Sequence, residues 1–414
     1  MQFKIIITFF ILNLKRKFRI QVFSLISISI CLSCSSNHFN NHIGDNKLKL
    51  DTLVINIEDC DQIIWDSIVS DVKIIFLENT PTSLIGSISD RSLFDKRIYI
   101  LDKVGNRLMV FDQLGKFIGH VGKRGKGFDE YLSIRDIAID PSTQHVFILD
   151  YRFIFEFDST LRFINKYQIT ADKKNKYINP LSFYRFSNEI YYFWVNGYEG
   201  IDKIASKNPK YHLHKMLDGK IEESSIEIQY MDNSLKRFIS SKYVYIMPSE
   251  FDYVIKRLDN NGLGGGFFVD FRDKKIPFLV INKDYTFSAN KSNKLNLANY
   301  CSSINMFIET DSLIYFQFIH KGVEYNFIRN IKTNQTLSGY NQLTLMDIIP
   351  LGNIIGYDKV TGSFVTYVEP IEILQLIRNK EIKSRNKISQ EILNSFLSIK
   401  DTDNPILVFI KLKF

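Results

Sequence analysis

Two neighbouring segments of this chain repeat each other, and this repeat constrains the fold more than any other feature of the sequence. "RIYILDKVGNRLMVFDQLGKFIGHVG" (97–122) matches "HVFILDYRFIFEFDSTLRFINKY" (145–167). The paired "ILD" units place Asp102 and Asp150 48 residues apart. Each segment predicts strand, turn, strand, turn and strand, and "IRDIAID" (134–140) adds a strand before the second segment.

The spacing of the repeat indicates a class of fold. The paired "FD" units place Asp112 and Asp158 46 residues apart, close to the spacing of the "ILD" units. Four antiparallel strands in about 45 to 50 residues is the pattern of a β-propeller blade. Repeats of about 48 residues over the folded part predict six or seven blades, within the usual range.

Strand-like runs rich in β-branched and aromatic residues support this interpretation along the rest of the chain. "TLVINI" (52–57) and "VKIIFLE" (72–78) open the series. Four later runs predict further, more divergent blades: 182–195, 242–259, 304–319 and 343–358.

The C-terminal part differs from the repeats. "KISQEILNSFLSI" (387–399) has apolar residues at helical spacing and predicts a short helix with Ser389 as its N-cap. "DTDNPILVFIKLKF" (401–414) returns to a strand pattern. We expect this terminal strand to complete a blade with strands from the other end of the chain, which removes an exposed edge.

The first 33 residues predict a signal peptide. "KRKFR" (15–19) is a basic region, and "IQVFSLISISICLS" (20–33) is an apolar run of 14 residues, short for a transmembrane helix. "CLSCSSN" (31–37) resembles a bacterial lipoprotein signal, which implies acylation of Cys34. An uncleaved anchor and ordinary secretion are the alternatives. The expected organisation is a signal peptide (1–33), a lipidated tether (34–51) and a propeller domain (52–414).

The charge of the chain does not indicate a nucleic-acid partner. The formal net charge is +8, but five positive charges and no acidic residue lie in residues 1–33, which leaves +3 on the remainder. An imbalance of this size is too weak for a nucleic-acid-binding surface.

The segment 102–127, followed by "IRDIAID", resembles an NHL-type propeller repeat. Nearly the whole mature chain is similar to the six-bladed β-propeller lipoproteins of gut-dwelling Gram-negative anaerobes. The matching pieces are residues 72–88, 119–131, 268–277 and 401–414, the last with its Asp-Asn-Pro sequence. The resemblance implies an all-β, six-bladed propeller and an outer-membrane lipoprotein that faces the periplasm or the surface.

"GHVGKRGKGFDEY" (119–131) carries the family's loop motif, whose residues here are Gly122, Gly125, Gly127, Glu130 and Tyr131. The family has Gly-Pro-Gly-Glu-Tyr where this chain has Phe128 and Asp129 in place of the Pro and Gly. We expect a connection between blades, with glycines at positive φ and Tyr131 packed beneath the loop. A phosphate or another anion held by Lys123, Arg124 and Lys126 is the alternative, although no helix follows to complete a phosphate loop.

Other candidate residues have structural interpretations. Asp102, Asp112, Asp150 and Asp158 at strand ends are expected to accept backbone hydrogen bonds in turns, the alternative being a cation or catalytic site. "HLH" (212–214) places His212 and His214 on one strand face, where we expect them to face solvent rather than bind metal.

The remaining predictions concern cysteines and glycine-rich or polar stretches. Cys60 and Cys301 form either a disulfide or two free buried thiols. "LGGGFF" (263–268) predicts a flexible loop that leads into a strand, and "NKSNKLN" (290–296) predicts a polar loop.

These observations favour a membrane-anchored binding module outside the cytoplasm, with an envelope protein or a glycan as its partner and with no cofactor. The alternative is a hydrolase or lyase that holds a divalent cation in the central channel, which rests on analogy between folds. No catalytic residue is identified, because no local motif of a hydrolase stands out.

Overall fold

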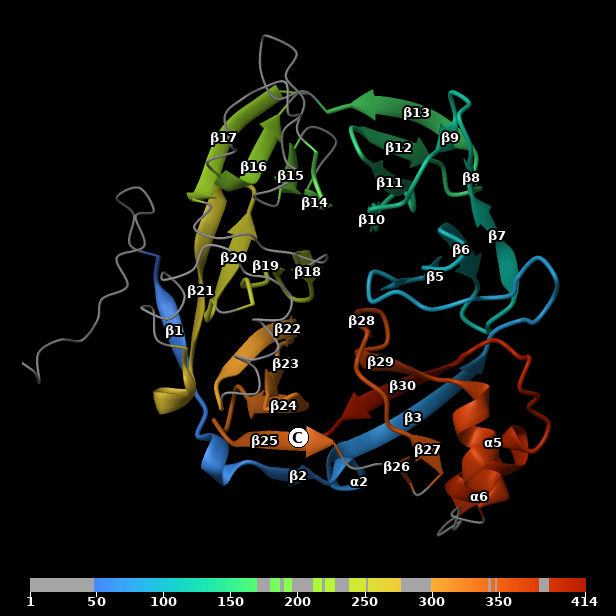
Figure 1. Ribbon diagram of the computed structural model, residues 1–414, viewed down its shortest axis with the longest axis vertical. Coiled ribbons are helices and arrows are strands. Elements are labelled where there is room, and N and C mark those ends of the chain that lie inside the picture. Colours follow the sequence, from blue (N-terminus) through green and yellow to red (C-terminus); the bar gives the residue numbers. More distant parts are fainter. Residues whose placement is uncertain are drawn as a thin grey trace, which may run out of the picture. The chain divides into compact units, whose positions relative to one another are not determined.

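The computed structural model describes residues 48–169, 179–186, 190–195, 211–217, 220–227, 238–250, 252–276, 299–341, 344–346, 348–379 and 387–414. Leu48–Phe414 forms one compact unit. In it, six sheets of four or five strands are arranged as the blades of a β-propeller (Figure 1). The predicted all-β, six-bladed fold is therefore confirmed. The predicted loop at 290–296 lies outside the described residues.

Blades 1 and 2 are the two repeats found in the sequence. The "ILD" units end the second strand of each blade, so Asp102 and Asp150 occupy equivalent positions. Blade 1 consists of β4 (Leu93–Phe94), β5 (Ile98–Asp102), β6 (Arg107–Phe111) and β7 (Phe117–Val121). Blade 2 consists of β10 (Asp136–Ile139), β11 (Val146–Asp150), β12 (Phe153–Phe157) and β13 (Phe163–Gln168).

The divergent repeats form blades 3 to 5. Blade 3 consists of β14 (Ser182–Arg185), β15 (Ile190–Trp194), β16 (Tyr211–Leu217) and β17 (Lys220–Glu227). Blade 4 contains β18 (Phe238–Ser240), β19 (Val244–Ile246), β20 (Val254–Asp259) and β21 (Gly262–Asp270). Blade 5 contains β22 (Cys301–Glu309), β23 (Leu313–His320), β24 (Val323–Asn330) and β25 (Thr336–Asn341).

Blade 6 joins the two ends of the described chain, as predicted. Its order is β28 (Gly356–Asp358), β29 (Ser363–Val368), β30 (Ile406–Leu412) and β3 (Val69–Phe76). The C-terminal strand β30 lies between its neighbours, with Val408 opposite Thr366 on one side and Ile74 on the other. Both edges of the terminal strand are therefore paired, which leaves no open edge at the closure.

Two N-terminal strands cover the outer edges of blades 4 and 5 instead of opening a blade of their own. β1 (Leu50–Val54) pairs parallel with β21, and β2 (Asp61–Ile63) pairs parallel with β25. β1, β2 and β3 thus run along the outside of three successive blades (Figure 1). The run at 52–57 was expected to open the series of strands, and the strand there, β1, begins at Leu50.

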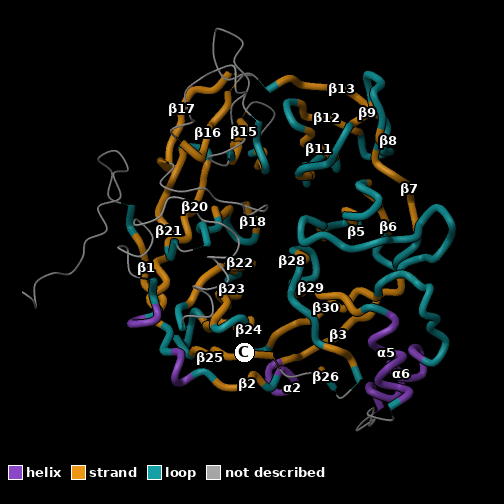
Figure 2. Tube along the Cα trace, viewed as in Figure 1, coloured by secondary structure: helices purple, strands orange, loops and turns teal. Residues whose placement is uncertain are grey.

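Helices and short strands occupy the connections (Figure 2). The helices are η1 (Ile57–Asp59), α2 (Trp65–Ile68), η3 (Arg272–Lys274), α5 (Pro370–Arg378) and α6 (Lys387–Phe396). The short strands are β8 (Lys123–Arg124), β9 (Glu130–Tyr131), β26 (Thr344–Leu345) and β27 (Ile349–Pro350). The predicted C-terminal helix is α6, but Ser389 is not its N-cap, because the helix already includes Lys387.

Helix α5 was not predicted, although the sequence contains its start signal. Glu369 and Glu372 form a reciprocal capping box, and Pro370 opens the first turn. These features satisfy the first backbone N–H groups of the helix.

The core lies between successive blades, so a blade strand is apolar on both faces. All five residues of β5 are buried. Ile98 and Ile100 pack in the core shared with blade 6. Tyr99 and Leu101, which point the other way, pack in the core shared with blade 2. The alternation of a strand therefore divides its side chains between two neighbouring blades.

The glycine-rich stretch at 263–268 is part of strand β21, so the prediction of a flexible loop was wrong. Gly265 and Gly266 both have positive φ. A Cβ on Gly266 would lie 2.0 Å from the Ile255 carbonyl oxygen of β20, and one on Gly265 would lie 2.7 Å from that of Lys49. The glycines thus allow two neighbouring backbones to approach a strand closely.

Candidate functional site

The predicted family loop is a short parallel strand pair that connects blades 1 and 2. β8 and β9 pair Lys123 with Glu130 and Arg124 with Tyr131. Tyr131 is buried beneath the loop, as expected, and burial raises the pKa of its phenol to about 12. Gly122 has a φ of 61°, and a Cβ there would lie 2.6 Å from the ring of Phe157. The loop is therefore paired along its own strands and packed against blade 2.

The carboxylate of Glu130 fills the interior of this loop. Its Oε1 lies 2.9 Å from Lys123 Nζ, and its Oε2 accepts a hydrogen bond of 2.8 Å from the backbone N–H of Gly127. The ion pair with Lys123, followed by the Gly127 N–H, lowers the pKa of Glu130. The loop does cradle an anion, but that anion is its own side chain, so the alternative of a bound phosphate is not supported.

The three glycines of the motif have two different roles. Only Gly122 has positive φ, whereas the prediction assigned positive φ to the glycines in general. A Cβ on Gly125 would lie 1.9 Å from Glu130 Oε2, and one on Gly127 would lie 3.0 Å from Glu130 Cδ. Gly125 and Gly127 therefore make room for the carboxylate.

The outer side of the loop presents aromatic and basic side chains. Phe128 is 72% exposed, and its ring packs edge-on against Phe163 at 5.7 Å. Lys166 Nζ lies 5.8 Å from the centre of the Phe128 ring. Leu132 is also exposed, and Arg124 Nε donates a hydrogen bond to its carbonyl oxygen.

The same surface continues onto the turn between β11 and β12. The Arg135 guanidinium lies 4.1 Å from the ring centre of Tyr151, which is itself exposed. Arg135 also donates to the carbonyl oxygen of Pro180 in the approach to blade 3. We call this area the loop surface, and its members are Phe128, Leu132, Arg135, Tyr151 and Lys166.

The strand-end aspartates are structural, as predicted. Asp102 accepts backbone hydrogen bonds from Gly86, Ser87 and Val104. Asp150 accepts one of 2.8 Å from Leu132 in the loop. Asp112 and Asp158 each accept two backbone hydrogen bonds within their own turns.

His212 and His214 lie on one face of β16, but the prediction that they face solvent was wrong. They are 4% and 8% exposed. The ring of His212 stacks on Trp194 at 4.7 Å and its Nδ1 donates to the Val195 carbonyl oxygen. Burial lowers the pKa of His214 to about 4, so its ring is neutral, with Ser224 Oγ and the Tyr211 carbonyl oxygen as partners. Both nitrogens of His214 are thus used within the protein.

Cys60 and Cys301 are free thiols. Cys301 begins β22 at the inner edge of the blade 5 sheet, and Cys60 precedes β2 at its outer edge, with β23, β24 and β25 in between. Of the two alternatives, the free thiols are therefore the ones present, with Cys301 buried and Cys60 only partly buried. Across the residues that the structure describes, no group of three or more His, Cys, Asp or Glu side chains converges as a metal site.

A series of polar contacts joins the innermost turns of the blades, and the sequence did not predict it. Gln144 of blade 2 donates to Asp95 of blade 1 at 3.1 Å. Arg185 of blade 3 binds Asp140 of blade 2 at 2.7 Å. Although partial burial opposes ionisation, hydrogen bonds from Ser142 and Arg185 lower the pKa of Asp140.

Blades 4 to 6 continue this series. Lys242 of blade 4 binds Asp311 of blade 5 at 2.8 Å, and Lys359 of blade 6 donates to Ser240 of blade 4 at 2.7 Å. One sequence signal was available, because Asp358-Lys359-Val360 has the residue types of Asp102-Lys103-Val104, although the first follows the innermost strand of its blade and the other follows a second strand. A repeat of this kind predicts the turn but not the direction in which the lysine side chain extends.

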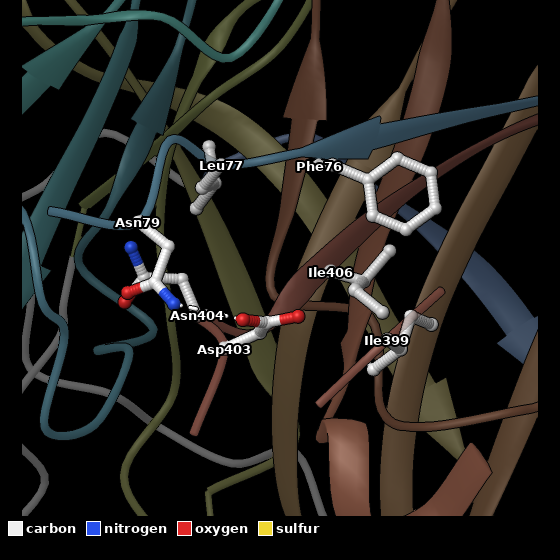
Figure 3. Close-up of a pocket in the computed structure, with 7 residues that line it drawn as sticks. All are labelled: Phe76, Leu77, Asn79, Ile399, Asp403, Asn404 and Ile406. Atoms are coloured by element: carbon white, nitrogen blue, oxygen red, sulfur yellow. Dashed lines mark hydrogen bonds between the residues drawn. The ribbon is translucent and has the colours of Figure 1, made fainter. Parts of the chain in front are cut away.

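The Asp-Asn-Pro sequence before β30 holds the chain around a small cavity (Figure 3). Asn404 Nδ2 donates to the carbonyl oxygens of Glu78 and Ser83, and its Oδ1 accepts from the Ile85 N–H. The cavity of about 120 Å³ is lined by Phe76, Leu77, Asn79, Ile399, Asp403, Asn404 and Ile406. It is smaller than the roughly 300 Å³ of ordinary ligand pockets, so we interpret this motif as a structural clamp.

The fold defines this chain as a six-bladed β-propeller closed by its terminal strands. Residues 52–411 match the profile of a protein family described as "Domain of unknown function (DUF4934)", and the chain belongs to this family. A search of curated proteins found no match. Within the described residues, no helix is both long and apolar enough to cross a membrane.

A solved structure shares the fold. A Bacteroides fragilis protein described as a "Putative exported protein" has a TM-score of 0.68 and 14% identity, and the match covers 88% of this chain and all of that one. A member of the DUF4221 family from Bacteroides vulgatus has a TM-score of 0.45 and 8% identity, with 83% and 97% of the two chains covered. The first of these two matches, at 14% identity, shows the fold alone.

Proposed function

We propose that this chain is an extracytoplasmic lipoprotein of the cell envelope, acylated at Cys34, whose propeller binds an envelope protein or a glycan through the loop surface. The observation that carries the proposal is the exposed Phe128 on a loop whose interior contacts are made by the Glu130 carboxylate. Exposed aromatic and basic side chains on an ordered scaffold are typical of binding sites, because little conformational entropy is lost on binding.

The proposed location rests on "CLSCSSN" (31–37) and on the resemblance to propeller lipoproteins. The description of the Bacteroides fragilis structure as exported agrees with it. We propose an outer-membrane anchor for the same reason. No observation in the described part of the chain favours a metal-dependent hydrolase or lyase, so we propose no catalytic role.

The anchor is tested by labelling cells that produce the protein with a radioactive or clickable palmitate. The wild-type chain should incorporate label and fractionate with membranes, whereas Cys34→Ala should do neither. Cys60→Ala is the matched control and should be labelled like the wild type. Equal labelling of wild type and Cys34→Ala would contradict the proposed anchor.

The binding surface is tested with a photo-crosslinking amino acid at position 128 in the same cells. We expect a discrete crosslinked product that is lost when Leu132 and Tyr151 are both changed to Ser. A crosslinker at Val104, which is also exposed but lies outside the loop surface, is the control. The absence of any product specific to position 128 would contradict binding at the loop surface.

A further inference from the structure

The turn between β28 and β29 holds Lys359 in a defined position. Asp358 is buried and accepts a hydrogen bond of 2.9 Å from the Val360 N–H and one of 2.6 Å from Thr361 Oγ1. An aspartate that caps its own turn fixes the backbone of the next residue. The direction of Lys359 is therefore set by the turn.

The side chain of Lys359 reaches past a whole blade. Its Nζ donates to Ser240 Oγ at 2.7 Å, and the hydroxyl of Tyr184 lies 3.3 Å from the same oxygen. Lys359 belongs to blade 6, Ser240 to blade 4 and Tyr184 to blade 3. Blade 5 separates blades 4 and 6 in the ring, so these three groups meet near the central axis, where the innermost strands face one another (Figure 1).

The ammonium of Lys359 lacks a compensating negative charge in the described ranges. Ser240 is its hydrogen-bond partner there, although an ammonium has three donors. Desolvation by the surrounding protein lowers the pKa of Lys359. The negative charge of Asp95 opposes this shift by a Coulombic interaction and not by a hydrogen bond. Asp95 Oδ2 instead accepts a hydrogen bond from Gln144. A desolvated charge without a partner is costly, and an anionic ligand would remove that cost.

The site is also open to solutes. Lys359 is an exposed residue, although surrounding protein atoms partly desolvate its ammonium. Two hydroxyl groups beside it can rotate to donate or accept hydrogen bonds. The contact between blades 4 and 6 is not needed to pack the ring, because each blade already packs on its own neighbours.

We propose that Lys359, Ser240 and Tyr184 form a binding site for a small monocarboxylate at the propeller axis. A carboxylate has two oxygens, which match the ammonium and the neighbouring hydroxyl donors. One negative charge compensates one ammonium, and the nearby carboxylate of Asp95 disfavours a dianion such as phosphate. This site is distinct from the loop surface and does not depend on it.

The test uses the full-length, lipidated protein in detergent and acetate as the probe. Acetate binding is measured by saturation-transfer NMR at constant ionic strength, with inorganic phosphate as the comparison. We expect Lys359→Met to weaken acetate binding by at least about tenfold. Lys103→Met is the matched control, because Lys103 has the same flanking residues and an exposed side chain, and it should bind acetate like the wild type.

A second variant keeps the test informative if Lys359→Met fails to fold. Tyr184→Phe retains the ammonium and removes one hydroxyl, so it should weaken acetate binding without loss of the thermal transition. Equal acetate binding by the wild type and a folded Lys359→Met protein would overturn the proposal, as would no acetate binding by the wild type. Tighter binding of phosphate than of acetate would overturn the assignment to monocarboxylates.

Discussion

Single carboxylates hold the connections of this propeller to its blades. Asp102 is 1% exposed, and besides its three backbone N–H donors it pairs with Arg107 Nε at 3.1 Å. Two of the donors, Gly86 and Ser87, come from the segment that enters blade 1. Asp150 binds the segment that enters blade 2 in the same way. The repeated "ILD" unit thus marks the point where each incoming connection is attached.

This role predicts a large effect of one substitution. Asp102→Ala leaves the N–H groups of Gly86, Ser87 and Val104 and the Arg107 guanidinium without their acceptor. We expect the free energy of unfolding to fall by about 3 kcal/mol or more. Urea denaturation followed by circular dichroism measures the change.

Asp112→Ala is the control for this substitution, because Asp112 binds only N–H groups of its own partly exposed turn. This substitution should lower the free energy of unfolding by about 1 kcal/mol, since water can replace the lost acceptor. Similar losses for the two variants would contradict the role assigned to Asp102.

At the scale of elements, blade 5 contains a buried polar network. Tyr315 donates to Asn326 at 2.6 Å, and Asn326 and Trp65 both donate to Asn341. Gln317 is buried nearby and donates to Glu324 at 2.8 Å. Desolvation raises the pKa of Glu324 to about 7. The strand therefore carries a carboxyl group that changes its charge near neutral pH.

This group makes the stability of the protein depend on pH. The pKa of Glu324 is about 7 in the folded state and about 4.3 in the unfolded chain. The folded state therefore binds the proton more tightly, and stability falls as pH rises from about 4.3 to 7. Glu324→Gln removes this dependence and should raise the free energy of unfolding at pH 8 by up to about 3 kcal/mol.

Urea denaturation of both proteins at pH 5 and pH 8 measures this effect. The two should differ much less at pH 5, because Glu324 is then largely protonated in the folded state. Glu222→Gln on β17 is the control, since Glu222 is exposed and should change stability little at either pH. A wild type that loses no stability relative to Glu324→Gln between pH 5 and 8 would contradict the assignment.

The sequence predicted elements better than it predicted contacts. The repeat located the strands of blades 1 and 2, because alternating apolar residues and turn aspartates both depend on local sequence. The prediction of a loop at β21 was wrong, because its glycines make room for the backbones of Lys49 and β20. These partners could not be identified from the local sequence. The burial of His212 and the reach of Lys359 also depend on partners in other strands or blades.

At the scale of the whole molecule, the ring depends on one strand that pairs on both sides. Val408 in the centre of β30 lies opposite residues of β29 and β3. Val408→Pro removes a backbone N–H from this ladder and should lower the free energy of unfolding by about 3 kcal/mol or more.

Val408→Ala is the matched control for the closing strand. This variant keeps the backbone N–H and loses only apolar contacts, so its free energy of unfolding should fall by about 2 kcal/mol. Thermal unfolding and size-exclusion chromatography measure the outcome. A Val408→Pro protein as stable and monodisperse as Val408→Ala would show that the closure is not essential to the ring.

The pairing of β1, β2 and β3 with the outer strands of three blades affects the order in which the propeller can fold. Their partners are β21, β25 and β30, all of which lie much later in the chain. These three strands are therefore synthesised long before the strands with which they pair. The earliest part of the propeller to be made is therefore the last to be paired, and until then its strands have unpaired edges.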